Sequence, residues 1–223
     1  MRALPAIVAL LAAFVATEAT AQSAKSSVQV GNLSLVGVPN TAATTDGWTN
    51  ILATTIHTSQ QKDLVMDVSL EAGLFTDTLV SSRKGRSDTS FAEAMIEVRV
   101  LVDGLAAMPA SVIYARRAQT LMASFGGVLE YCDDENDDGI IDGETECEFS
   151  DEQLQLVLDT MGAHSFNFLL DDVGSGSHSI VVQAKITTDS SAQEGAASAR
   201  AVLGNGSLVV EEVRLVNGAS ISL

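Results

Sequence analysis

The sequence predicts a mainly β protein, an antiparallel β-sandwich of the jelly-roll kind with one inserted calcium loop and one short helix. Hydrophobic and polar residues alternate with a period of two through most of the chain, as in strands that bury one face. Glycine-containing turns separate these runs. Many strands joined by such turns favour a sandwich, and a single acidic segment interrupts the pattern.

Alternation is clearest in four runs, around residues 66–71, 96–103, 166–171 and 179–187. Further strands are expected near 27–37, 49–58, 110–122, 197–204 and 207–215. The predicted turns are Asp103-Gly104, Gly174-Ser175-Gly176 and Gly204-Asn205-Gly206. Two polar stretches, 81–90 and 188–197, are expected to be loops.

One helix is predicted at the end of the acidic segment. Ser150 can cap it, with Gln153 as the capping-box partner, and two acidic residues occupy the first turn. Gly162 can end it. An apolar stripe at helical spacing supports the helix: Leu154, Val157, Leu158 and Met161. Residues 132–162 are therefore expected to form one excursion between two strands, a disulfide-framed acidic loop followed by a helix.

The first 21 residues have the three parts of a secretory signal peptide. Arg2 gives the positive end, Ala3 to Ala16 is apolar but too short to span a membrane comfortably, and Ala19-Thr20-Ala21 is a cleavage site. Cleavage after Ala21 leaves residues 22–223, a length that suits one domain. We expect a protein that is secreted or periplasmic and not inserted in a membrane.

The net charge is −17 and the sequence pI is about 4.3. Such a chain lacks the basic face that binds nucleic acid, and it is repelled by anionic membranes. Its charge suits solubility and cation binding. Hydrophobic residues make up 46% of the chain, which is enough for a folded core.

The only two cysteines, Cys132 and Cys147, frame the acidic segment. In an exported chain they are expected to form one disulfide that joins the ends of the loop. The alternative is a pair of free thiols, which an oxidising compartment disfavours.

The segment between these cysteines has the spacing of a Ca²⁺-binding loop. Calcium takes several oxygen ligands, and alternate residues can supply them when a glycine permits a sharp turn. Asp134, Asn136 and Asp138, followed by Gly139, fit the pattern D-x-[DN]-x-[DN]-G. Only this register places a glycine where the turn needs it.

Residues 134–146 resemble an EF-hand loop and, more closely, the loops of thrombospondin type 3 repeats and dockerins. The resemblance implies a backbone carbonyl ligand from Ile140 and a ligand, often through water, from Asp142. The position of the bidentate glutamate is Thr145 here. Two flanking residues can close the shell instead: Glu144 and Glu146.

The flanks of the loop differ from an EF-hand. Residues 122–131 contain two adjacent glycines and favour a strand or turn, not a helix. We therefore expect an isolated loop within another fold, without the helix-opening switch of sensor proteins. The alternatives are an acidic surface loop with no ion, and Mg²⁺, which prefers fewer protein ligands.

The sequence contains no catalytic motif with recognised spacing. None of its three histidines, His57, His164 and His178, has a second histidine at metal-binding spacing. We expect a secreted, calcium-binding, non-catalytic module with a binding, adhesion or structural role, whose partner is an extracellular protein or glycan. The alternatives are a subunit of a homo-oligomeric extracellular assembly and a calcium-stabilised extracellular hydrolase.

Overall fold

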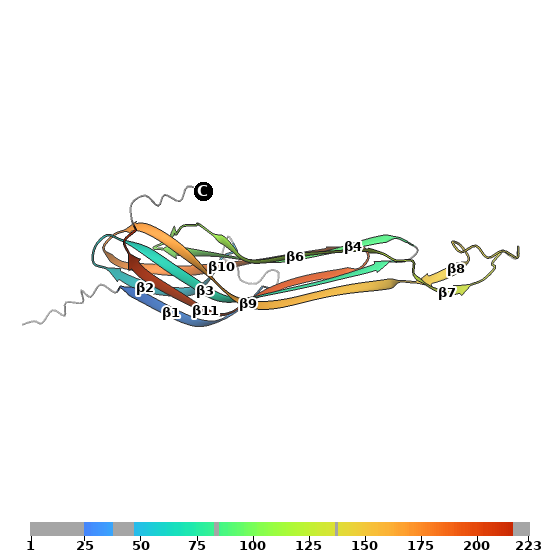
Figure 1. The fold of residues 1–223 in the computed structure, drawn as a ribbon, viewed down its shortest axis with the longest axis horizontal. Coiled ribbons are helices and arrows are strands. Elements are labelled where there is room, and N and C mark those ends of the chain that lie inside the picture. Colours follow the sequence, from blue (N-terminus) through green and yellow to red (C-terminus); the bar gives the residue numbers. More distant parts are fainter. Residues whose placement is uncertain (1–24, 38–46, 83–84, 137, 216–223) are drawn as a thin grey trace, which may run out of the picture.

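In a computed structural model of the chain, residues 25–37, 47–82, 85–136 and 138–215 are described. They form an elongated sandwich of two antiparallel sheets (Figure 1), and no helix occurs among them. The predicted signal peptide, residues 1–21, lies outside the described part. No helix in the described residues is long and apolar enough to cross a membrane.

The first sheet has the strand order β1-β11-β3-β9. Its strands are unusually long, and β3 alone extends about 70 Å at 3.3 Å per residue. Their bounds are β1 Ser26–Gly37, β3 Lys62–Ser82, β9 Glu152–Val173 and β11 Ala196–Val213.

The second sheet has the order β2-β10-β4, and both β5 and β6 pair with the far side of β4. Their bounds are β2 Thr49–Thr58, β4 Ser87–Val102, β5 Leu105–Ala106, β6 Val112–Ser124 and β10 Gly176–Ala192. A separate hairpin, β7 Val128–Cys132 and β8 Cys147–Ser150, extends from one end of the sandwich (Figure 1).

This strand order is that of a jelly roll. Apart from the β4-β5-β6 segment and the β7–β8 hairpin, consecutive strands lie in opposite sheets, so the chain winds around the core. The first and last strands of the wound chain, β1 and β11, lie side by side and pair from Ser26↔Glu211 to Gly37↔Ala201. The predicted antiparallel, jelly-roll-like sandwich is confirmed.

The core lies in the half of the sandwich away from the hairpin. Even-numbered residues of β3 and β4, such as Met66, Val68, Ile96 and Val98, are fully buried between the sheets. Burying each such side chain contributes about 1.5–3 kcal/mol relative to exposure. The predicted alternation in these two runs is therefore the alternation of core and surface.

Small polar residues fill much of the interior in the half nearer the hairpin. Thr76, Thr78, Ser90 and Gln119 are buried there. The Gln119 amide donates to Thr78 Oγ1 and to the carbonyl of Leu156 (2.8 Å), and its oxygen accepts from Thr76 Oγ1 (2.8 Å). This network joins β3, β6 and β9. It also satisfies the buried Gln119 amide, which would be costly to bury without hydrogen-bond partners.

The predicted helix is wrong. Residues 152–173 form β9, which pairs with β3 from Ser82↔Glu152 to Lys62↔Val173. The leucines at 154, 156 and 158 also alternate with a period of two, and pairing with a long neighbouring strand overrides the weak local helical preference. The excursion from the sandwich is therefore shorter than 132–162, because it ends where β9 begins.

Three smaller corrections concern the predicted turns and loops. Gly204-Asn205-Gly206 is a bulge within β11, where the register shifts between Leu203 and Gly206. The Glu71 carboxylate accepts hydrogen bonds from the Asn205 backbone and side-chain amides, at 3.0 and 2.8 Å. The polar stretches 81–90 and 188–197 are mostly strand, since β4 and β10 extend into them.

Candidate metal site at the tip of the sandwich

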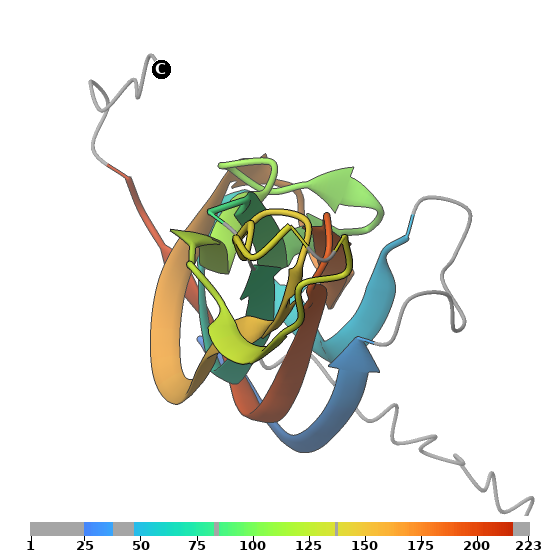
Figure 2. The same ribbon diagram turned by 90° about the vertical axis from the view of Figure 1, so that its right-hand side faces the viewer.

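The β7–β8 hairpin holds the acidic loop at one end of the long sandwich (Figures 1 and 2). Cys132 and Cys147 are paired in the ladder and joined by the predicted disulfide. The Asp133 amide donates to the carbonyl of Glu146 (2.9 Å), which extends the pairing one step into the loop. The ends of the candidate site are thus fixed by a covalent bond and by backbone hydrogen bonds.

The first half of the loop turns at Gly139, as the sequence predicts. Its φ is +79°, a left-handed conformation that other residues adopt at a cost. The Asp134 carboxylate reaches across this turn and accepts from the amides of Asp138 (3.2 Å) and Gly139 (2.8 Å). Asp134 therefore closes the loop from its first ligand position.

Three more predicted ligands accept hydrogen bonds from amides closer in the loop. The side-chain oxygens of Asn136, Asp138 and Asp142 each accept from the amide two residues on, at 2.9, 2.8 and 2.9 Å. These Asx-type turns fix the side chains close to the backbone. Because each oxygen has two lone pairs, accepting one hydrogen bond leaves it able to bind a cation.

The two glutamates that can complete the shell differ in position. Glu146 is buried, and its Oε2 accepts from the Asp142 amide (2.8 Å), while its own amide donates to the Asp142 carbonyl (2.8 Å). Glu144 is exposed on the loop, as is Ile140, whose carbonyl is the expected backbone ligand. Glu146 is thus the glutamate turned into the loop.

The predicted ligands all lie in one loop. Within the described residues, which omit Asp137, no group of three or more His, Cys, Asp or Glu side chains is placed to hold a metal ion. The donors are hard oxygens, as Ca²⁺ prefers, and the glycine turn is present.

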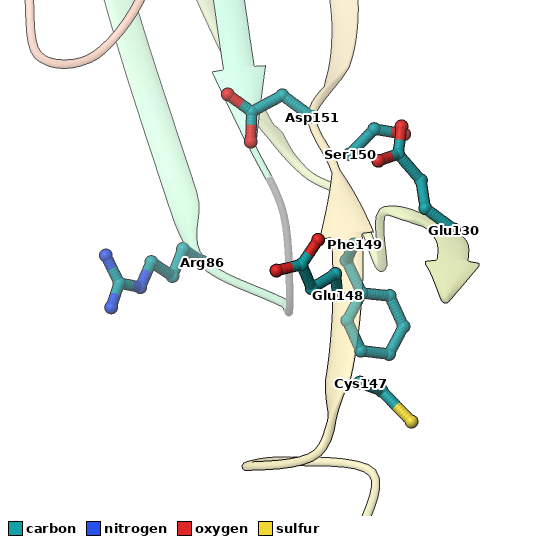
Figure 3. A pocket seen from close by; sticks show the side chains of 7 residues that line it. All are labelled: Arg86, Glu130, Cys147, Glu148, Phe149, Ser150 and Asp151. Carbon is teal, nitrogen blue, oxygen red and sulfur yellow. The ribbon is translucent and has the colours of Figure 1, made fainter. Parts of the chain in front are cut away.

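A hollow of about 590 Å³ lies at the base of the hairpin (Figure 3). Acidic side chains line it, and the Arg86 guanidinium points away from them. Its lining residues include no histidine. The residues are Arg86, Glu130, Cys147, Glu148, Phe149, Ser150 and Asp151.

A histidine and a carboxylate do meet at the other end of the sandwich. His178 Nδ1 lies 2.7 Å from Asp103 Oδ2, and its Nε2 lies 3.2 Å from Thr58 Oγ1. The order of groups is that of a hydrolytic triad. Thr58 is fully buried, however, and its hydroxyl donates to the carbonyl of Gly174, so substrate cannot reach it.

This cluster serves to fasten turns. Asp103 occupies the predicted Asp103-Gly104 turn, with positive φ at both residues, and its Oδ1 accepts from the Ser179 amide (2.8 Å). The hydrogen bonds from His178 and then from Ser179 lower the pKa of the Asp103 carboxyl. The β4–β5 hairpin is thereby joined to the start of β10.

No protein-family model and no curated protein matches the chain. Among solved structures, one match is a chain described under "Crystal structure of the T13 IBDV viral particle reveals a missing link in icosahedral viruses evolution". The two are 9% identical with a TM-score of 0.14, and the match covers 90% of this chain and 42% of that chain. A similarity this low carries no argument about fold or function.

Proposed function

We propose that the protein is a secreted or periplasmic, non-catalytic jelly-roll module that binds Ca²⁺ at the loop on its tip. The observation that carries the proposal is the geometry around Gly139, where the Asp134 carboxylate closes a left-handed glycine turn in the register expected for a calcium loop. The net charge of −17 adds to the attraction for a cation.

Calcium binding would order the loop at the tip of the elongated sandwich. The loop lies at the far end of strands that run the length of the sandwich, so it can present a calcium-dependent surface away from the core (Figure 1). The disulfide limits the freedom that the loop loses on binding. A partner of this tip is an extracellular protein or glycan. Extracellular calcium modules have Kd values of roughly 10⁻⁴–10⁻³ M, which we expect here.

The test is calorimetric titration of the mature, oxidised protein with Ca²⁺, and separately with Mg²⁺. We expect one Ca²⁺ per chain, and loss of binding in Asp134→Asn/Asp138→Asn. The control is Asp159→Asn/Asp189→Asn, which removes the same charge from exposed strand positions and leaves binding intact. Equal heats for Ca²⁺ in the two double variants would contradict the proposal.

A glycine pair tests the turn itself. Gly139→Ala places a side chain at φ +79°, which disfavours this turn by about 1–2 kcal/mol. The free loop of the variant relaxes to avoid the strain, so re-forming the turn on binding weakens Ca²⁺ binding by up to about tenfold. Gly143→Ala is the matched control, because Gly143 lies in the same loop without positive φ and with open space around it.

A further inference from the structure

From residue 153 to residue 167, the outer edge of β9 is a long strand edge with no described strand beside it. Met108 pairs with Leu169 through two backbone hydrogen bonds of 2.7 and 2.8 Å, so the amide and carbonyl of Leu169 point away from β3. The register with β3 is continuous from residue 170 to 152, so the odd-numbered residues from 153 to 167 point the same way. No described strand pairs with them.

The other edges carry features that discourage pairing, and residues 153–167 of β9 do not. The edge strands β1, β2 and β6 each have a register shift within their paired length, whereas the shift in β9 lies at its end, beyond Leu170; β6 also carries Arg116 and Arg117. Between 152 and 173, β9 has no lysine, arginine or proline. Such devices are how natural sheets keep their edges from joining other chains.

The strand that forms this edge also carries exposed apolar side chains. Residues whose side chains are 39–65% exposed follow one another along β9: Leu154, Leu156, Val157, Leu158, Met161 and Phe166. The inner-face leucines remain exposed although they face the second sheet. Across from them, β6 contributes polar contacts, from Gln119 to the Leu156 carbonyl (2.8 Å) and from Arg117 to Thr160 (2.7 Å).

We propose that two copies of the chain associate through their β9 edges, antiparallel about a two-fold axis at Thr160. This register places like residues opposite each other. Gln153 faces Asn167 and Gln155 faces Ser165 on the outer face, Val157 faces Ala163, and Leu154 faces Phe166 on the inner face. Each pair occurs twice by symmetry.

Neighbouring registers match less well. An axis at Asp159 would place two carboxylates directly opposite each other, which is destabilising. A two-fold axis between two residues would place each odd-numbered residue opposite an even-numbered one. The free N–H and C=O groups of one copy would then face residues of the other copy whose N–H and C=O groups already point toward β3, and they would find no hydrogen-bond partner. Asp159 is the only acidic residue between 153 and 167, so the edge itself offers little repulsion despite the charge of the whole chain.

The size of the contact indicates a reversible dimer. A ladder over residues 153–167 is about 50 Å long, and a sheet is about 10 Å thick, so the two partners bury roughly 1,000 Å² together. This is near the lower limit for a specific interface. The association is independent of the calcium proposal, because the loop lies outside the paired residues.

Sedimentation velocity in EDTA, at concentrations from about 1 to 100 μM, tests the dimer without involving the loop. We expect a concentration-dependent shift from monomer to dimer. Val157→Lys should raise the dissociation constant at least tenfold, since it sets a lysine on the outer face of the edge. Val30→Lys, at an exposed valine on the opposite edge strand β1, is the control and should leave it unchanged.

A cysteine at the axis tests the register. Thr160 would face its own copy at a non-hydrogen-bonded position, where the Cα separation of about 4.5 Å permits a disulfide. Thr160→Cys should form a covalent dimer under mild oxidation, whereas Gln29→Cys on β1 should not. Circular dichroism checks that each variant is folded. A monomer at every concentration, a larger oligomer, or a dimer unaffected by Val157→Lys would overturn the proposal.

Discussion

Asp88 is a buried carboxylate that ties three parts of the chain together. Its Oδ2 accepts from the Ser81 amide (2.7 Å), and its Oδ1 accepts from the amides of Thr89 (2.8 Å) and Glu194 (3.0 Å). It is 1% exposed. The end of β3, the start of β4 and the turn between β10 and β11 therefore depend on one side chain.

Asp88→Asn should lower the free energy of unfolding by about 2–3 kcal/mol, because the new amide group cannot accept the hydrogen bonds that one carboxylate oxygen receives. Chemical denaturation measures the change. Asp189→Asn, at an exposed position on β10, is the control and should stay within about 0.5 kcal/mol of the parent. Equal stabilities for the two variants would contradict the role of Asp88.

The same carboxyl gives stability a defined pH dependence. Burial acts to raise the pKa of Asp88, but hydrogen bonds from backbone amides outweigh it, and the pKa lies below its ordinary value. As pH falls, the carboxyl is protonated in the unfolded chain before it is protonated in the folded chain. The stabilisation is therefore present above about pH 3.9, and it is lost as pH falls further, through the lower pKa of the folded state. Denaturation between pH 5 and 2 should show a smaller acid loss in Asp88→Asn than in the parent.

The sequence does not mark Asp88, because it lies in a polar stretch that resembles a loop. The loop ligands are different, since their spacing is local and Gly139 fixes the register without knowledge of the fold. The choice between Glu144 and Glu146 could not be made from spacing. It depends on which side chain turns back onto Asp142.

Among the elements, β9 shows why the helix was predicted wrongly. Leu154, Leu158 and Met161 satisfy a helical period, and Leu154, Leu156 and Leu158 satisfy a strand period. Pairing with β3 decides between the two periods. The half of β3 nearer the hairpin is itself hard to predict from the sequence, because its inward residues include threonines as well as hydrophobic residues. Strand length was underestimated for the same reason.

The β7–β8 hairpin is closed by the Cys132–Cys147 disulfide, and we expect its stability to depend on this bond. Removing it with Cys132→Ser/Cys147→Ser should lower the free energy of unfolding by about 3 kcal/mol, because the bond closes a loop with a sequence separation of 15. Chemical denaturation under oxidising conditions measures this. An unchanged unfolding free energy would mean that the hairpin unfolds independently of the sandwich.

For the whole molecule, alternation and turn chemistry were enough to predict an antiparallel sandwich of the jelly-roll kind. The order of the strands required the structure, because pairings such as β1 with β11 join residues at opposite ends of the chain. The elongated form also follows from long-range pairing. It separates a hydrophobic half from a polar half that ends in the acidic hairpin (Figure 1).

Hydrogen–deuterium exchange of the mature, oxidised protein, with EDTA and with millimolar Ca²⁺, tests calcium binding at the tip most directly. Calcium should slow exchange of the loop amides between Cys132 and Cys147, above all those of Asp138 and Gly139, and leave the sandwich unchanged. Mg²⁺ should protect them less. Loop amides that exchange equally fast with and without Ca²⁺, or protection confined to the sandwich, would contradict a calcium site in this loop.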